Sequence, residues 1–304
     1  MGTEPPPARL GRQLRESSGS SKILVLVMSA GINPWNEIED RGQVPLLTEN
    51  ASLIKEHYWV SGRPDFPETK LIRAMTQLNK FRMWHYPDKG KIFNVLRTLL
   101  IMPLRVLPTR KILNFALKRS GLVSEMPSRE NRVALNFPIS TFLSGLRATG
   151  NLRWALGHFS FDYLVRITSN CLVNERALIR EIDSFPKNRV FAGTELAAGF
   201  ISGAALVMSR DVVSSIVNHE KYLRLDVYED LALSELVRKR DLADFHHLPR
   251  LEISSTALAE SIEISTLEDA PIFRCKAELP LTRSPEKVLA IFKILANRLD
   301  WKVS

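Results

Sequence analysis

Short apolar runs separated by turn residues divide the first part of the chain into elements. The run from Lys22 to Ser29 (KILVLVMS) is apolar and rich in β-branched residues, which is typical of a buried strand. Residues Ala30 to Pro34 end it with a turn, and a helical stretch is expected from Trp35. His57 to Val60 predicts a second strand, ended by Ser61-Gly62-Arg63-Pro64. This order of elements opens an α/β domain with a parallel sheet.

The later part of the chain repeats this alternation. The pattern predicts a helix over Pro138–Leu156, strands at Phe161–Ile167, Phe200–Ser209 and Leu248–Ser254, and a helix over Leu231–Arg240. A terminal amphipathic helix is expected over Ser284–Leu299, with Ser284 as its cap and Pro285 at its first position. The chain has no internal repeat and no glycine-rich dinucleotide or P-loop motif, so those two classes lose their main support.

The composition limits the alternatives. With 304 residues, 45% of them hydrophobic, the chain can form one large domain or two small ones with a sizeable core. Its two cysteines are too few for a disulfide framework and lack the spacing of a zinc site. No run of about 18 apolar residues predicts a membrane-spanning helix. Residues 1–20 lack the apolar stretch of a secretory signal and are expected to form a disordered tail. We therefore expect a cytoplasmic protein.

The positive charge is concentrated in one window. The net charge of the whole chain is +9, but Lys70 to Arg119 holds twelve basic residues and one acid, a net charge of +11. Such a patch favours an anionic partner, namely nucleic acid, phospholipid or a phosphorylated substrate; the alternative is a solvated surface without a partner. The window has few aromatic residues arranged for base stacking and no known binding motif, so we expect no nucleic-acid partner.

Within this window, residues 89–122 combine leucines at helical spacing with basic residues. A basic amphipathic helix can lie on an anionic membrane surface, at the inner face of the membrane for a cytoplasmic protein. The alternative is a helix packed on the core with a basic outer face. Pro103 and Pro108 would break any long continuous helix.

Several stretches, taken together and in order, carry a more specific signal. They are Pro34–Ile38 with Arg41–Gln43, Arg147–Trp154, Phe161–Asn174 and Phe200–Asp211, followed by Tyr228–Ala232. In combination they resemble the β-1,3-galactosyltransferase and fringe group of glycosyltransferases and its bacterial and viral relatives. The segment Pro45–Thr48 departs from the Thr-Trp pair of that group, and Arg147 stands in place of its lysine. The resemblance covers about residues 22 to 254.

The resemblance implies a GT-A fold, a Rossmann-like mixed sheet flanked by helices. Residues 21–304 would form one such domain, with a basic helical insertion at about residues 85–125. The implied activity is inverting transfer of a sugar from a nucleotide sugar, with UDP favoured, to a hydroxyl of a glycan or glycolipid. A degenerate, non-catalytic protein of the same fold, acting as a sugar-binding or scaffold protein, is the alternative.

The resemblance also assigns roles to residues on the acceptor side. Asp230 matches the catalytic base, and Glu229 is the neighbour that would substitute for it or orient the acceptor. The structural alternative is that this pair caps a helix and interacts with its dipole. Ser202 and Gly203 are expected to line the acceptor side; the alternative for Gly203 is that it only permits close packing.

The donor side lacks the acids that hold a divalent ion in the group. Those positions fall at Thr168, Ser169 and Asn170, whose neutral oxygens and amide are poor ligands for Mn²⁺ or Mg²⁺. We therefore expect no tightly bound metal, while these residues hydrogen-bond the ribose or a phosphate.

The charge of the diphosphate must then be neutralised by basic side chains. Arg274 and Lys276, which share a face if their segment is extended, are the candidates, together with Arg166 or Arg147. Surface charges without a ligand are the alternative for Arg274 and Lys276.

The nucleoside is expected after the first two strands, because ligands occupy the carboxyl ends of strands in such sheets. The residues concerned are Ser29, Ala30, Gly31 and Asp65. His246 and His247 are adjacent, so on a strand they face opposite ways and are expected to be surface or packing residues rather than metal ligands.

Overall fold

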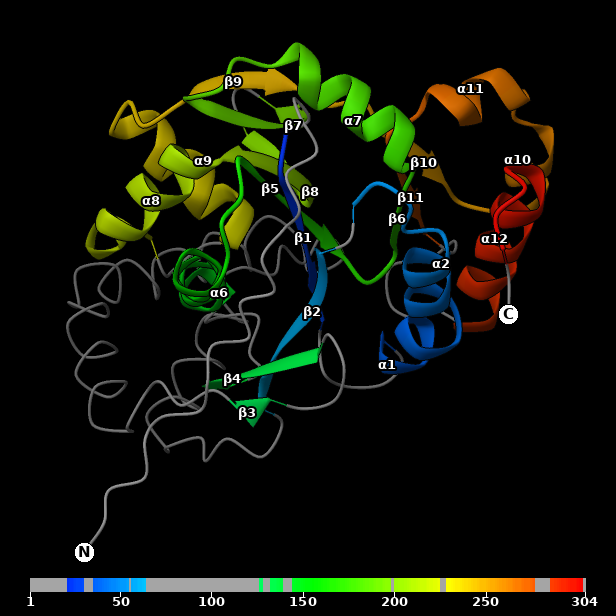
Figure 1. Cartoon of the computed structure of the whole chain (residues 1–304), viewed down its shortest axis with the longest axis horizontal. Helices are drawn as coiled ribbons and strands as arrows, with labels where there is room; N and C mark the ends of the chain where they lie inside the picture. The colour runs from blue at the N-terminus through cyan, green and yellow to red at the C-terminus, as the bar shows by residue number, and fades with distance from the viewer. Residues whose placement is uncertain are drawn as a thin grey trace, which may run out of the picture.

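The computed structural model describes residues 21–29, 35–54, 56–63, 126–127, 132–138, 144–197, 200–224, 228–276 and 285–302 (Figure 1). Several predictions lie outside these residues: the tail at 1–20, the basic insertion with its membrane-binding segment 89–122, Ala30, Gly31, Asp65 and the cap at Ser284.

Eight strands form the main sheet in the order β3-β4-β2-β1-β5-β8-β7-β9. Their bounds are β1 Ile23–Met28, β2 Glu56–Arg63, β3 Met126–Pro127, β4 Arg132–Pro138, β5 Tyr163–Thr168, β7 Val190–Ala197, β8 Phe200–Ser209 and β9 Asp244–His247. Strand β1 pairs in parallel with β2 and β5, whereas β8 runs antiparallel to β5 and β7. The predicted α/β fold with a mixed sheet is confirmed.

Helices cover both faces of this sheet (Figure 1). Alternate residues of β1 and β5, such as Leu24 and Leu164, pack on α6 (Ser144–His158), α8 (Arg210–Asn218) and α9 (Glu229–Lys239). The residues between them, such as Val25 and Val165, pack on the opposite side with α7 (Glu175–Ser184). Both β1 and β5 are therefore buried on both faces, which explains their continuous apolar runs.

A second, three-stranded sheet lies beside the first and has the order β10-β11-β6. Its strands are β6 Cys171–Val173, β10 Leu251–Ile253 and β11 Ile272–Cys275. The N-terminal helices and the C-terminal helices lie near this sheet. They are α1 Trp35–Ile38, the π-helix η1 Glu39–Gln43, α2 Val44–Glu49, α10 Thr256–Ser261, α11 Ile264–Asp269 and α12 Pro285–Arg298. Elsewhere, the 3₁₀ turn η4 (Glu220–Tyr222) lies beside α8. Gly42 lets α12 pack closely, because a Cβ there would lie 2.6 Å from Leu289 and 2.8 Å from Phe292.

The structure corrects two expected boundaries and adds elements that the pattern did not predict. Pro138, where a helix was expected to begin, is the last residue of β4 and pairs with β2, and α6 begins at Ser144. Strand β2 continues through Ser61-Gly62-Arg63, where a turn was expected, because these residues pair with β4. The elements that were not predicted are strands β3, β4, β6, β7 and β9, helices α7, α8, α10 and α11, and the 3₁₀ turn η4. Among the described residues, no helix is both long and apolar enough to span a membrane.

Candidate functional site

The predicted site residues gather where three strands of the main sheet end or begin. Met28 at the end of β1 pairs with Thr168 at the end of β5, and Ile167 pairs with Ala205 on β8. Because β8 is antiparallel to β5, its first residues, including Ser202 and Gly203, lie near the carboxyl end of β5. Ligands bind at this edge in open α/β sheets.

Ser29 and Ser169 meet through a buried acid that the sequence analysis did not name. Ser29 Oγ donates to Glu39 Oε2 at 2.8 Å, and Ser169 Oγ donates to Glu39 Oε1 at 2.5 Å. Arg132 lies 3.8 Å from the same carboxylate. Burial raises the pKa of Glu39, although the bonds from Ser169 and Ser29 work against that shift. Glu39 lies in the π-helix η1, a distortion that is often found at functional sites.

Gln43, at the other end of η1, fixes the turn between β5 and β6. Its Nε2 donates to the carbonyl oxygens of Thr168 at 3.0 Å and Cys171 at 2.7 Å, while its Oε1 accepts a bond from Trp59 Nε1 at 3.1 Å. Within the turn, Thr168 Oγ1 donates to Asn170 Oδ1 at 2.9 Å. The turn is therefore shaped by side chains from distant segments.

Thr168, Ser169 and Asn170, which stand where the resembling glycosyltransferases have their metal-binding acids, do not fit a divalent ion. Ser169 and Asn170 are only 3% and 2% exposed, and both are engaged inside the protein. Asn170 Nδ2 donates to the carbonyl of Cys275 at 2.9 Å, which ties the turn to β11. No group of three or more His, Cys, Asp or Glu side chains suited to a metal occurs in the described ranges. Neutral, buried and already bonded groups of this kind are poor ligands for Mg²⁺ or Mn²⁺.

The two cysteines and the two adjacent histidines lie in strands. Cys171 and Cys275 are free and buried, and burial raises the pKa of both thiols. His246 and His247 belong to β9; His246 packs against Phe185, with ring centroids 5.4 Å apart, and His247 is exposed. The histidines thus occupy packing and surface positions, as predicted.

The acidic pair, Glu229 and Asp230, forms the first turn of α9. Asp230 Oδ2 accepts a bond from the backbone N–H of Gly203 at 3.1 Å, and Oδ1 accepts one from the N–H of Leu231 at 2.9 Å. A Cβ on Gly203 would lie 2.8 Å from Cβ of Asp230, closer than real Cβ atoms come to a neighbour. Asp230 can therefore rest on β8 only because residue 203 is glycine.

Arg166 is the buried partner of the acidic pair. Its side chain is 2% exposed, forms an ion pair with Glu229 and donates from Nη1 to the carbonyl of Gly203 at 3.3 Å. Burial, reinforced by Arg147, lowers the pKa of Arg166 to about 10, while Asp230 opposes this shift. Arg147 Nε is buried without a hydrogen-bond partner among the described residues. Arg166 thus lies beside the acidic pair, and Arg147 is close enough to Arg166 to lower its pKa.

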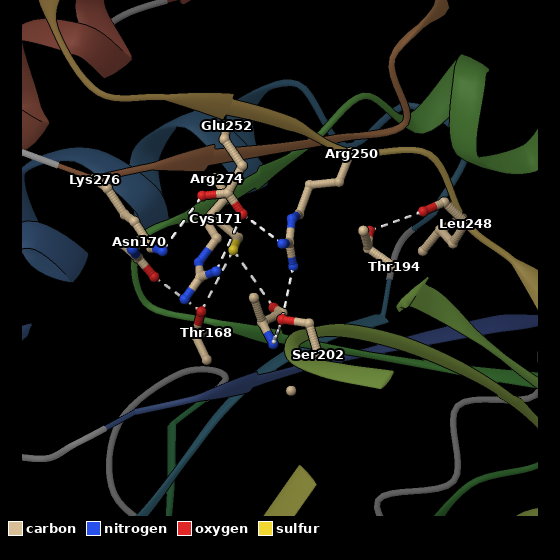
Figure 2. A network of polar contacts seen from close by, with 12 residues as sticks. Thr168, Asn170, Cys171, Thr194, Ser202, Leu248, Arg250, Glu252, Arg274 and Lys276 are labelled. Carbon is tan, nitrogen blue, oxygen red and sulfur yellow. Dashed lines mark hydrogen bonds and ion pairs between the residues drawn. The ribbon is translucent and has the colours of Figure 1, made fainter. Parts of the chain in front are cut away.

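A basic cluster, defined as Arg250, Arg274 and Lys276, surrounds the carboxylate of Glu252 (Figure 2). As their spacing predicted, Arg274 and Lys276 reach the same side and contact this one group. Arg250 and Glu252 were missed. Both fall within the predicted strand Leu248–Ser254 and stand two residues apart, the spacing that places side chains on one face.

Ser202 and Gly203 link the acidic pair to the basic cluster. Ser202 Oγ accepts a bond from Arg250 Nη1 at 2.8 Å, as Figure 2 shows, whereas Gly203 binds Asp230. Consecutive strand residues face opposite ways, so the two groups lie on opposite sides of β8. A ligand that crosses the strand ends can contact both, with a carboxylate on one side and positive charge on the other.

The chain matches no protein-family model and no curated protein. Among solved structures, it is similar to mouse xyloside xylosyltransferase 1 in its apo form. The two share 10% sequence identity with a TM-score of 0.37, over 87% of this chain and 100% of that one. A likeness this slight does not assign the chain to a family or an activity.

Proposed function

We propose that this protein transfers a sugar from a nucleotide-sugar donor to a hydroxyl of a glycan or glycolipid acceptor, on a GT-A fold. The observation that carries the proposal is the position of Asp230. Its carboxylate is held against Gly203 at the edge where β1 and β5 end, and the basic cluster lies across β8 from it. The sequence resemblance of Phe200–Asp211 and Tyr228–Ala232 to the matching glycosyltransferase stretches supports the same assignment.

In the proposed reaction, Asp230 acts as general base. Its carboxylate takes the proton of the acceptor hydroxyl while the acceptor oxygen forms a bond to the anomeric carbon of the donor sugar. The bond between that carbon and the diphosphate oxygen breaks, and the nucleoside diphosphate leaves with the electron pair. Attack from the side opposite the leaving group inverts the anomeric configuration.

Glu229 is the weaker candidate for the base. It is bound to the buried Arg166, and its side chain is only 14% exposed. Removing Glu229 from that ion pair would leave Arg166 uncompensated, which is costly in a buried site. We assign Glu229 and Arg166, with Arg147 beside them, to positioning the N-terminus of α9 and its Asp230.

The leaving diphosphate is neutralised by the basic cluster. Arg274 and Lys276 are 19% and 43% exposed and can reach a ligand, whereas Arg250, at 2%, contributes its charge from behind them. Arginine binds phosphate through two parallel hydrogen bonds and lysine adds a compact charge. In this proposal the donor nucleotide, with UDP favoured by the resemblance, lies over the end of β1 near Ser29, and the acceptor lies near Ser202 and Gly203.

The test is turnover of nucleotide sugars by the purified protein and an Asp230→Asn variant. A panel of UDP-, GDP- and CMP-sugars is screened for thermal stabilisation and for release of the free nucleotide, with a glycan or glycolipid mixture as acceptor. Loss of a general base should lower turnover by about 100-fold or more.

Asp211→Asn is the matched control. Asp211 also lies in the first turn of a helix and also accepts two hydrogen bonds, from Arg189 N and Ser209 Oγ, but it is in α8, away from the acidic pair. Its variant should turn over donor as the wild type does. Full turnover by Asp230→Asn, or neither stabilisation nor turnover with any donor, would refute the proposal and favour a non-catalytic protein.

A further inference from the structure

Glu252 is the common partner of all three members of the basic cluster. Its Oε1 lies 3.1 Å from Arg274 Nη1 and also pairs with Arg250 Nη2, while its Oε2 lies 3.5 Å from Lys276 Nζ. Figure 2 shows the three cations converging on this carboxylate: Arg274 from β11, Lys276 from the residue after β11, and Arg250 from the residue before β10. Three positive charges thus face one negative charge, an excess of two.

The members of the cluster differ in their exposure within the described part of the chain. Glu252 and Lys276 are 42% and 43% exposed, whereas Arg250 is 2% exposed. The Nε atoms of Arg250 and Arg274 are buried and lack hydrogen-bond partners within the described part of the chain. Burial raises the pKa of Glu252, but Arg274, Arg250 and Lys276 outweigh it and lower that pKa overall, so the carboxylate is ionised near neutral pH.

The excess of two positive charges matches the diphosphate of an intact nucleotide sugar better than that of a free nucleoside diphosphate. Each phosphate diester of an intact nucleotide sugar carries one negative charge, so its diphosphate carries two. A free nucleoside diphosphate has a terminal phosphate with a second pKa of about 6 and therefore carries about three charges near pH 7.5. Without Glu252, the three cations would match the leaving group rather than the donor.

We propose that Glu252 is a built-in counter-ion that sets the charge of this site for a doubly charged diphosphate diester and so limits retention of the more highly charged nucleoside diphosphate. This inference rests on the proposed glycosyl transfer and deepens it. The carboxylate competes with the ligand for Arg274 and Lys276, and its repulsion grows with the ligand's charge. Removing it should strengthen binding of both ligands, and of the product-like one more.

The experiment uses two probes without base or sugar, so that it does not depend on the identity of the donor. Pyrophosphate, with about three charges near pH 7.5, represents the product, and P1,P2-dimethyl diphosphate, with two, represents the donor. Calorimetric titrations in EDTA at low ionic strength compare the wild type with Glu252→Gln. If the diester binds about 5-fold more tightly to the variant, repulsion proportional to charge predicts a gain of about 10-fold for pyrophosphate.

Two further variants control the result. Lys276→Gln, at an exposed position, lowers the excess charge and should weaken pyrophosphate more than the diester. Asp241→Asn removes a carboxylate from an exposed pair with Arg189, outside the basic cluster, and should leave both affinities unchanged. Thermal unfolding of each variant checks that the fold is intact; if Glu252→Gln does not fold, the Lys276→Gln comparison decides.

Equal gains for the two probes, or no gain in Glu252→Gln, would overturn the inference. Equal losses for the two probes in Lys276→Gln would do the same. The outcome is separate from that of the transfer assay. A larger affinity change for pyrophosphate than for the diester, without any sugar transfer, would support the role of Glu252 and refute the proposed function. Sugar transfer that depends on Asp230, with equal affinity changes for the two probes, would support the proposed function and refute the role of Glu252.

Discussion

Gly203 donates its backbone N–H to the carboxylate of Asp230, and Asp230 occupies the space that a side chain at position 203 would fill. The same glycine accepts a hydrogen bond at its carbonyl from Arg166, which pairs with Glu229. One backbone position on β8 thus organises both members of the acidic pair.

Gly203→Ala should lower transfer by about tenfold or more, because the new methyl would lie 2.8 Å from Cβ and 3.1 Å from Oδ2 of Asp230 and push the carboxylate away. We expect a loss of about 1–3 kcal/mol in the free energy of unfolding, as for other overpacked sites. Donor turnover and urea unfolding measure the two effects. Gly157→Ala is the control, since a Cβ there meets nothing within 4 Å. Unchanged turnover in Gly203→Ala would show that this placement of Asp230 does not matter.

Arg166→Met should lower the free energy of unfolding by about 3–5 kcal/mol, because it leaves Glu229 in a largely buried site without its partner. Adding Glu229→Gln should recover part of that loss, since no lone charge then remains. Urea denaturation measures both. Arg153→Met, which breaks an exposed pair with Glu220, should cost no more than about 1 kcal/mol. An equally small loss for Arg166→Met would argue against the positioning role.

Chelation of divalent ions should leave transfer nearly unchanged. The residues at the expected metal position are buried and internally bonded, while positive charge is supplied by Arg274 and Lys276. The measurement is turnover before and after treatment with EDTA. Activity that collapses on chelation and returns with Mn²⁺ would contradict the prediction.

The free energy of unfolding of Glu39→Gln, relative to that of the wild type, should increase as the pH rises from about 5 to about 8. Burial raises the folded-state pKa of Glu39 above its unfolded value, so stability from its protonation is present at low pH and lost as the pH rises through that raised pKa. Urea unfolding of both proteins at the two pH values measures the change.

Glu235→Gln serves as its control. Although burial acts to raise the pKa of Glu235, its bonds to Lys239 and Arg224 lower it overall, so that its contribution is lost only on acidification below this range. The stability difference between Glu235→Gln and the wild type should therefore stay constant between the two pH values. An equally constant difference for Glu39→Gln would contradict the prediction.

Local patterns identified the frame of the site. The apolar runs of β1, β5 and β8 are visible because both faces of these strands are buried. The resemblance assigned Gly203 and Asp230 to the acceptor side, and the structure shows that the two residues are in contact. Strand β2 was cut short because Ser61-Gly62-Arg63 has turn chemistry, which its pairing with β4 overrides.

The polar partners were decided by the tertiary structure alone. Glu39 meets Ser169 across 130 positions of sequence, and Arg250 meets Ser202 across 48. Hydrophobic periodicity reports which face of an element is buried, but it is silent about which polar groups meet where elements end. The sequence by itself therefore determined the strands β1, β2, β5 and β8 of the main sheet and singled out the acidic pair. Only the packing of distant segments gathered three cations around Glu252 and made Arg166 a partner of Glu229. Arg166 needs that partner because a buried charge is tolerated only where an opposite charge or hydrogen bond lies within reach.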